Sequence, residues 1–112
     1  MKIFGLAGWS GSGKTKTLVS LVSILISRGI SVSTVKHAHH TFDIDKPGKD
    51  SYEHRVAGAQ EVVVASTRRW AIIHENKSRK EATLTELLDR ISPSDIILVE
   101  GFKTATHPKI EV

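Results

Sequence analysis

The fold of this chain is decided near its start by residues 8–15, Gly8-Trp9-Ser10-Gly11-Ser12-Gly13-Lys14-Thr15. The stretch fits the pattern G-x-x-x-x-G-K-T, which is typical of a loop that wraps around the phosphates of a nucleoside triphosphate. Glycines suit such a loop because a residue without a Cβ lets the backbone turn sharply and approach the oxygens. We expect Lys14 to reach the β- and γ-phosphates and the Thr15 hydroxyl to ligate Mg²⁺.

The residues on either side of this stretch support the interpretation. Residues 2–7 form a short apolar run, as a buried strand should, and apolar residues at helical spacing follow Thr15. Arg28 suits the last turn of that helix, and Gly29 can end it. The alternative is a glycine-rich turn that precedes Lys-Thr by chance. Strand, glycine loop and helix in this order favour the phosphate loop.

Composition bounds the class of protein. The chain has 112 residues, enough for one domain, and no cysteine, which excludes a disulfide framework, a thiolate nucleophile and cysteine-ligated zinc. Its N-terminus lacks the pattern of a secretion signal, and its most apolar stretch, residues 18–26, is too short to span a bilayer. We therefore expect a cytoplasmic protein that does not enter a membrane.

The net charge of +4 does not by itself indicate nucleic acid. Basic residues are scattered, with clusters only at 68–69 and 77–80, and no nucleic-acid recognition motif accompanies them. An anionic small ligand accounts for the charge equally well. We expect no nucleic-acid partner.

The rest of the chain alternates strands and helices. Strands are expected at residues 30–35, 61–66, 69–74 and 95–99, helices at 52–57 and 83–91, and an extended run at 108–112. Asp50 or Ser51 would cap the first of these helices, and Trp70 would be partly buried. After a phosphate loop, this order predicts a single α/β domain over residues 1–112, of the three-layer P-loop NTPase type, with a mostly parallel sheet flanked by helices on both faces.

A second candidate site lies at Ile96-Ile97-Leu98-Val99-Glu100. A buried strand that ends in an acid would carry Glu100 to the carboxyl edge of the sheet, where it would meet Mg²⁺ beside the phosphate loop. Gly101 would let the backbone pass close to the γ-phosphate. The alternative is a core strand that ends in a solvated acid.

The loop over residues 36–51 is rich in titratable groups. His37, His39 and His40 with nearby aspartates could ligate zinc or another transition metal, line a ligand or switch site, or be solvated without function. Asp43, Asp45 and Asp50 are further candidates for the Mg²⁺ sphere, and the sequence does not rank them. Asp50 and Ser51 have a simpler explanation as helix caps.

Several of these pieces together resemble one family. They are residues 8–15, Val35-Lys36-His37-Ala38-His39-His40, Phe42-Asp43-Ile44-Asp45-Lys46-Pro47-Gly48-Lys49-Asp50-Ser51, Ala57-Gly58-Ala59, Val99-Glu100-Gly101-Phe102-Lys103 and Pro108-Lys109-Ile110-Glu111. In order and spacing the chain is similar to the molybdopterin-guanine dinucleotide biosynthesis protein B (MobB) family. Many proteins share the phosphate loop, whereas the histidines with D-x-D-K-P-G-K-D-S are specific to this family.

The resemblance implies a GTP-binding, weakly hydrolysing, Mg²⁺-dependent protein of molybdenum cofactor maturation. Such a protein would be an adaptor beside the guanylyltransferase (MobA) or the apo-molybdoenzymes, and would typically be a homodimer. Family members continue beyond the P-K-I-E segment, where the guanine-recognising element lies, so the fold is expected to be truncated at its C-terminus. Asn76-Lys77-Ser78-Arg79 lacks the aspartate of N-K-x-D, and GTP over ATP is therefore implied by resemblance only.

The expected site residues have three roles. Lys14 and Glu100 would act in catalysis, and Thr15 and Glu100 would ligate the metal. The residues expected to bind the nucleotide are Gly8, Gly11, Ser12, Gly13, Lys14, Thr15, Lys16, His37, Asp50 and Gly101. Hydrolysis should be slow, because no arginine or glutamine is clearly placed to stabilise the transition state. The alternatives are a small-molecule kinase or an ATP-dependent accessory NTPase, and a module that binds an anion or a pterin without turnover.

Overall fold

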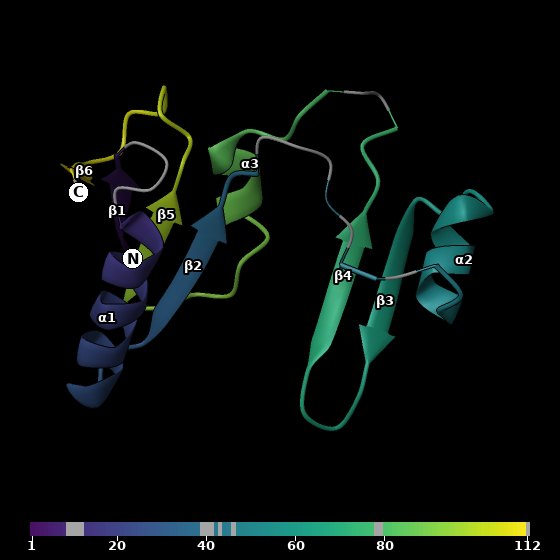
Figure 1. Ribbon diagram of the computed structural model, residues 1–112, viewed down its shortest axis with the longest axis horizontal. Helices are drawn as coiled ribbons and strands as arrows, with labels where there is room; N and C mark the ends of the chain where they lie inside the picture. The colour runs from purple at the N-terminus through teal and green to yellow at the C-terminus, as the bar shows by residue number, and fades with distance from the viewer. Residues whose placement is uncertain (9–12, 39–41, 43, 46, 78–79, 112) are drawn as a thin grey trace. The chain divides into compact units, whose positions relative to one another are not determined.

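The structure is a computed structural model that describes residues 1–8, 13–38, 42, 44, 45, 47–77 and 80–111. The chain forms two compact units (Figure 1). The first unit comprises Met1–His40 and Leu84–Val112, and the second comprises Thr41–Thr83. The expected single domain over residues 1–112 stays a prediction. No helix within the described residues combines the length and the apolar content needed to cross a membrane.

The first unit is built on a parallel sheet of four strands, in the order β2-β5-β1-β6 (Figure 1). These strands are β1 (Lys2–Ala7), β2 (Val32–Lys36), β5 (Ile96–Glu100) and β6 (Lys109–Glu111). The central strand β5 lies between β1 and β2 and pairs Glu100 with Leu6 on one side and with Lys36 on the other. The expected mostly parallel sheet is confirmed.

Strands β2 and β5 begin later than the sequence predicted, because Ser31 and Asp95 join the two strands through their side chains. The Ser31 N–H and hydroxyl both donate to Asp95 Oδ2, at 2.9 and 3.1 Å, and the Asp95 N–H donates to Ser31 Oγ at 2.8 Å. These hydrogen bonds lower the pKa of Asp95 below its usual value. The pair therefore lies at the edge of the sheet where the strands start, away from Glu100.

Helices cover both faces of this sheet. On one face, Leu84 of α3 (Leu84–Leu88) packs with Ile97 and Val99, which are completely buried. Alternate residues of a strand point to opposite faces, so Leu98 and Glu100 face the other way. There Glu100 meets Thr15 of α1 (Lys14–Ser27). Helix α3 is shorter than expected because its end tightens: Arg90 and Ile91 donate to carbonyls three residues back.

The second unit contains one helix and one hairpin. Helix α2 (Asp50–Val56) packs on β3 (Glu61–Ala65), which pairs antiparallel with β4 (Trp70–His74). The cap position of α2 is Lys49, so the prediction that Asp50 or Ser51 caps it is wrong; Asp50 lies inside the first turn, where a carboxylate interacts favourably with the helix dipole.

The hairpin has one covered face and one exposed face. Val62 of β3 is buried, whereas Val63, Trp70 and Ile72 on the opposite face are 63, 67 and 50% exposed. The expected partial burial of Trp70 is therefore wrong. Among the described residues, the chain places no second layer on that face of the two-stranded sheet.

Candidate functional site

The start of helix α1 provides hydrogen-bond donors and positive charge. Gly13 precedes the helix in the left-handed conformation, with φ 95° and ψ 15°, and has no side chain to cap it. The first bond of the helical ladder runs from the Thr17 N–H to the Gly13 carbonyl at 3.0 Å. The N–H groups of the preceding residues therefore have no acceptor within the helix. With no acid in this turn and with Lys14 and Lys16 in it, the helix start suits an anion.

The oxygens of Thr15 and Glu100 lie side by side. Thr15 Oγ1 is 3.5 Å from Glu100 Oε1, at the upper limit of a hydrogen bond. Both are hard oxygen donors of the kind that Mg²⁺ prefers, and at this separation a small movement lets both approach one cation. The two residues therefore fit a Mg²⁺ ion, with Thr15 on the helix start and the half-buried Glu100 at the end of β5.

His37 is joined to Glu100 and Gly101 by the backbone. Its N–H donates to the Glu100 carbonyl at 2.8 Å, one residue beyond the paired ends of β2 and β5. Gly101 has φ 97°, and a Cβ at this position would lie 2.6 Å from the His37 Cβ. Only glycine satisfies both conditions. The structure thus brings Thr15, His37, Glu100 and Gly101 to the carboxyl edge of the sheet, where ligands bind in open α/β folds.

Phe102 is a site residue that the sequence analysis did not identify. Its ring stacks on the His37 imidazole, with centroids 4.3 Å apart and planes inclined by 17°. It also has a left-handed backbone, with φ 52°, although it is not glycine. The available signal was an aromatic residue directly after the Glu-Gly pair, but neither its backbone conformation nor its partner can be read from that position.

The remaining expected residues fall into three groups. Gly8 directly follows β1, and Lys16 is exposed in the first turn of α1. Gly11 and Ser12 lie outside the described residues. Asp50 belongs to the second unit, where it is exposed at the start of α2.

Asp45 is engaged in an ion network of the second unit. Its carboxylate is 2.5 Å from Nη2 of Arg55 and 3.1 Å from Nε, and Nη1 of Arg55 lies 2.9 Å from Glu75. The Asp45 side chain is only 7% exposed, and its hydrogen bond with Arg55 holds the pKa of this carboxyl below its usual value. A carboxylate already neutralised in this way is a poor candidate for the Mg²⁺ sphere.

The described residues do not add ligands to the transition-metal site proposed for the histidine loop. In the part of the chain that the structure describes, no three histidine or acidic side chains gather as a metal site. His39, His40 and Asp43 lie outside that part. The hypothesis for the histidine loop therefore stays untested.

A parallel sheet with a Gly-Lys-Thr helix start and an acid beside it at the carboxyl edge defines an α/β protein of the P-loop NTPase type. The particular family follows from sequence: the chain belongs to the family described as molybdopterin guanine dinucleotide synthesis protein B, which matches over residues 3–112.

Relatives and solved structures agree with this membership. Two proteins named molybdopterin-guanine dinucleotide biosynthesis adapter protein are similar to the chain. The one from Escherichia coli (strain K12) is 48% identical over 110 residues, and the one from Haemophilus influenzae is 45% identical over 109. Each match covers 96% of this chain but only 63 and 61% of the relative, so the chain spans less than two thirds of their length.

Among solved structures, a molybdopterin-guanine biosynthesis protein B matches with a TM-score of 0.78 at 31% identity, over 97% of this chain and 66% of that one. MobB of Bacillus subtilis matches with a TM-score of 0.81 at 27% identity, over 100 and 68%. The P-loop NTPase-like fold expected from the sequence is confirmed.

Proposed function

We propose that this chain binds GTP with Mg²⁺, hydrolyses it slowly and acts as an adapter in the biosynthesis of molybdopterin guanine dinucleotide. The observation that carries the proposal is the 3.5 Å approach of Thr15 Oγ1 and Glu100 Oε1 beside the uncapped start of α1. A helix start offers donors to any anion, but a hydroxyl and a carboxylate converging next to it suit a metal-bound phosphate in particular. The proposed pathway and the proposed role as an adapter are taken from the names of the two relatives.

The site residues divide the work by chemistry. The backbone of Gly8, Gly11, Ser12 and Gly13 would surround the phosphates, and Lys14 and Lys16 would add positive charge. Thr15 and Glu100 would hold Mg²⁺, which would neutralise part of the phosphate charge. His37 and Gly101 would lie beside the γ-phosphate at the edge of the sheet, and Asp50 would contact another part of the nucleotide or cofactor.

Slow turnover follows from the residues of the first unit. Its segments, residues 1–40 and 84–112, hold two arginines and no glutamine. Arg28 follows the C-terminal end of α1, at the opposite end of that helix from Thr15, and Arg90 follows α3. Neither arginine comes from the elements that form the Thr15–Glu100 site. Stabilisation of the transition state by an arginine or by a glutamine-held water would have to come from elsewhere.

The proposed partners are a second copy of the chain, the guanylyltransferase MobA and apo-molybdoenzymes. The exposed hairpin face with Val63, Trp70 and Ile72 supports association with a second copy, because contiguous exposed apolar side chains mark interaction surfaces. Light scattering during size-exclusion chromatography tests this part. We expect a dimer for the wild type and a shift to monomer for Trp70→Asp; a monomeric wild type contradicts it.

Calorimetric titration with GTP and ATP in the presence of Mg²⁺ tests the binding proposal. Lys14→Ala should weaken GTP binding by tenfold or more, since a hydrogen bond to a charged group contributes about 1.5–3 kcal/mol. Lys2→Ala is the matched control, because Lys2 is an exposed lysine where β1 starts, at the other edge of the sheet. Equal affinity in Lys14→Ala and wild type overturns the proposal. Stronger binding of ATP than GTP favours the kinase or accessory NTPase instead.

A further inference from the structure

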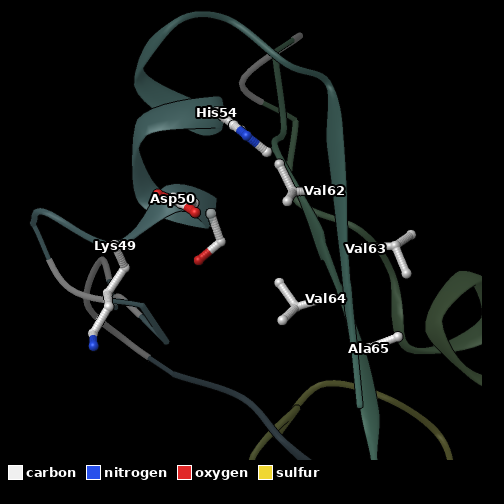
Figure 2. A pocket seen from close by; sticks show the side chains of 8 residues that line it. Lys49, Asp50, His54, Val62, Val63, Val64 and Ala65 are labelled. Carbon is white, nitrogen blue, oxygen red and sulfur yellow. The ribbon is translucent and has the colours of Figure 1, made fainter.

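A cavity of about 380 Å³ lies within the second unit, between α2 and β3 (Figure 2). This volume falls in the range of small-molecule sites, which runs from roughly 300 to 1,000 Å³. Its polar side consists of Lys49, Asp50, Ser51 and His54. Its apolar side is made by β3, and Figure 2 shows Val62 and Val64 pointing toward α2 while Val63 points away.

The polar side is held in place by the ion network behind it. Arg55 of α2 holds Asp45 through Nε and Nη2. The guanidinium of Arg55 also lies over the Tyr52 ring, 5.2 Å from its centroid. These contacts tie α2 to Asp45 and Glu75 on either side of it in the sequence. A ligand that binds there loses less free energy to the ordering of side chains.

Asp50 in the first turn of α2 and His54 in its last turn both line the cavity. Asp50 and His54 are four residues apart, so they lie on the same face of α2, and both are exposed. An ionised aspartate accepts hydrogen bonds through two oxygens and donates none. It therefore selects a ligand that presents two adjacent N–H groups. The methyl groups of Val62 and Val64 provide an apolar surface on which the face of a flat ring can lie.

We propose that this cavity binds a 2-amino-4-oxopyrimidine ring, the part that guanine and pterin have in common, with Asp50 as the acceptor for its N–H edge. The ring N–H and the exocyclic amino group next to it match the two oxygens of Asp50. Lys49 would attract an anionic substituent. Adenine is disfavoured, because an acceptor nitrogen stands where guanine has its N–H. The inference rests on the proposed function, which supplies both rings.

Three probes without phosphate separate this site from the phosphate loop: guanosine, 6-hydroxymethylpterin and adenosine. Calorimetry on the chain should detect binding of guanosine, of the pterin or of both, with adenosine at least tenfold weaker. Asp50→Asn should weaken binding by about tenfold to a hundredfold, as expected for loss of a hydrogen bond to a charged acceptor. Glu53→Gln is the matched control, since Glu53 is the other acid of the same turn and does not line the cavity.

Two further variants, Val64→Lys and Lys14→Ala, distinguish a failure of this inference from a failure of the proposed function. Val64→Lys should also abolish probe binding, and Val64 is 46% exposed, so the fold should tolerate the lysine. Lys14→Ala should leave probe binding unchanged even though it weakens GTP, so failure of the proposed function and failure of this inference give different results. Guanosine alone or the pterin alone identifies the natural source of the ring.

The inference is overturned if neither guanosine nor the pterin binds, or if Asp50→Asn binds them as Glu53→Gln does. If neither probe binds and Val64→Lys converts a dimer to a monomer, the occupant of the cavity is a second copy of the chain.

Discussion

The imidazole of His37 lies almost parallel to the ring of Phe102, with centroids 4.3 Å apart. The two residues follow neighbouring strands, β2 and β5, and Phe102 also packs against the buried cluster of Leu84, Ile97 and Val99. Phe102 has a left-handed backbone, which is costly for a residue with a large side chain. The core thus fixes the orientation of His37 through Phe102, directly beside Glu100.

Loss of this stack should be measurable as an energetic coupling. In a double-mutant cycle with Phe102→Leu and His37→Ala, we expect a coupling of about 0.5–1.5 kcal/mol in the free energy of unfolding, the usual contribution of a stacked ring pair. Urea denaturation of the wild type and the three variants measures it. Phe102→Tyr keeps the ring and should retain the coupling. Additive effects in the Leu cycle would show that the stack contributes nothing to stability.

Gly101 should tolerate a side chain less well than another left-handed glycine. At Gly29, φ is 78° and a Cβ would meet nothing within 4 Å, so Gly29→Ala should cost only the backbone term of roughly 1–2 kcal/mol. At Gly101 the added Cβ would also collide with His37, which should destabilise the protein by about 1–3 kcal/mol more. Chemical denaturation of both variants makes the comparison. Equal losses would mean that His37 moves aside freely.

The sequence was sufficient for the features that depend on local patterns. The glycine loop, the helix after it and the apolar strand ending in Glu100 predicted the α/β fold and the meeting of Thr15 with Glu100, and the structure places these two residues together. That His37 lies against Gly101 depends on the register of β2 with β5, which no single segment contains. Local periodicity also cannot show that β3 and β4 pair only with each other in the described sheets.

Contacts between distant residues account for the rest. Asp45 was an equal candidate with Asp43 and Asp50 for the metal, and only the folded loop reveals that Arg55, ten residues on, neutralises it. The left-handed backbone of Phe102 is sterically disfavoured, so propensity argues against it. It persists because the His37 stack and the core hold the ring.

Replacement of Arg55 should loosen the second unit, and lysine should only partly substitute. The planar guanidinium of Arg55 donates to both Asp45 oxygens and to Glu75 at the same time. A lysine has a single ammonium group without this fixed geometry and cannot reproduce all of these hydrogen bonds. We expect amide hydrogen exchange in α2 and β3 to be slowest in wild type, faster in Arg55→Lys and fastest in Arg55→Ala. Arg68→Ala, in the exposed turn of the hairpin, is the control and should exchange like wild type. Equal protection in Arg55→Ala would contradict a stabilising role.

The same network predicts a loss of stability in acid. The pKa of Asp45 is lowered below its ordinary value of 3.8, chiefly by the hydrogen bond from Arg55 and against the effect of burial. The unfolded state therefore binds the proton more readily than the folded state does. The Asp45–Arg55 pair stabilises the fold fully above about pH 3.8, and this contribution is lost as the pH falls through the lower pKa of Asp45 in the folded state. Between pH 2 and 6, the midpoint temperature of unfolding should fall less steeply with decreasing pH in Arg55→Ala than in wild type. Parallel curves for the two proteins would refute the assignment.

His107 lies over the backbone of Gly5, which leaves no room for a side chain on β1. A Cβ at Gly5 would lie 2.7 Å from Cδ2 of His107 and closer still to Nε2. The φ of Gly5 is not in the left-handed region, so Gly5→Ala introduces a steric conflict without backbone strain. We expect it to destabilise the protein by about 1–3 kcal/mol, and His107→Ala to relieve much of that loss in the double variant. Additive losses, measured by urea denaturation, would mean that the conflict lies elsewhere.

Protonation of His107 should also oppose folding. Both of its ring nitrogens are buried and have no hydrogen-bond partner among the described residues, and burial, with the charge of Lys109 second, lowers the pKa of His107 below its ordinary 6.5. The unfolded chain then takes up the proton at a higher pH than the folded chain does. The free energy of unfolding therefore keeps its full value, as far as His107 is concerned, above about pH 6.5. It declines as the pH falls toward the lower pKa that His107 has in the folded state. Urea denaturation at pH 5.5 and 7.5 should show a smaller difference in the free energy of unfolding between the two pH values for His107→Ala than for wild type. If His107→Ala keeps the wild-type difference, another group causes it.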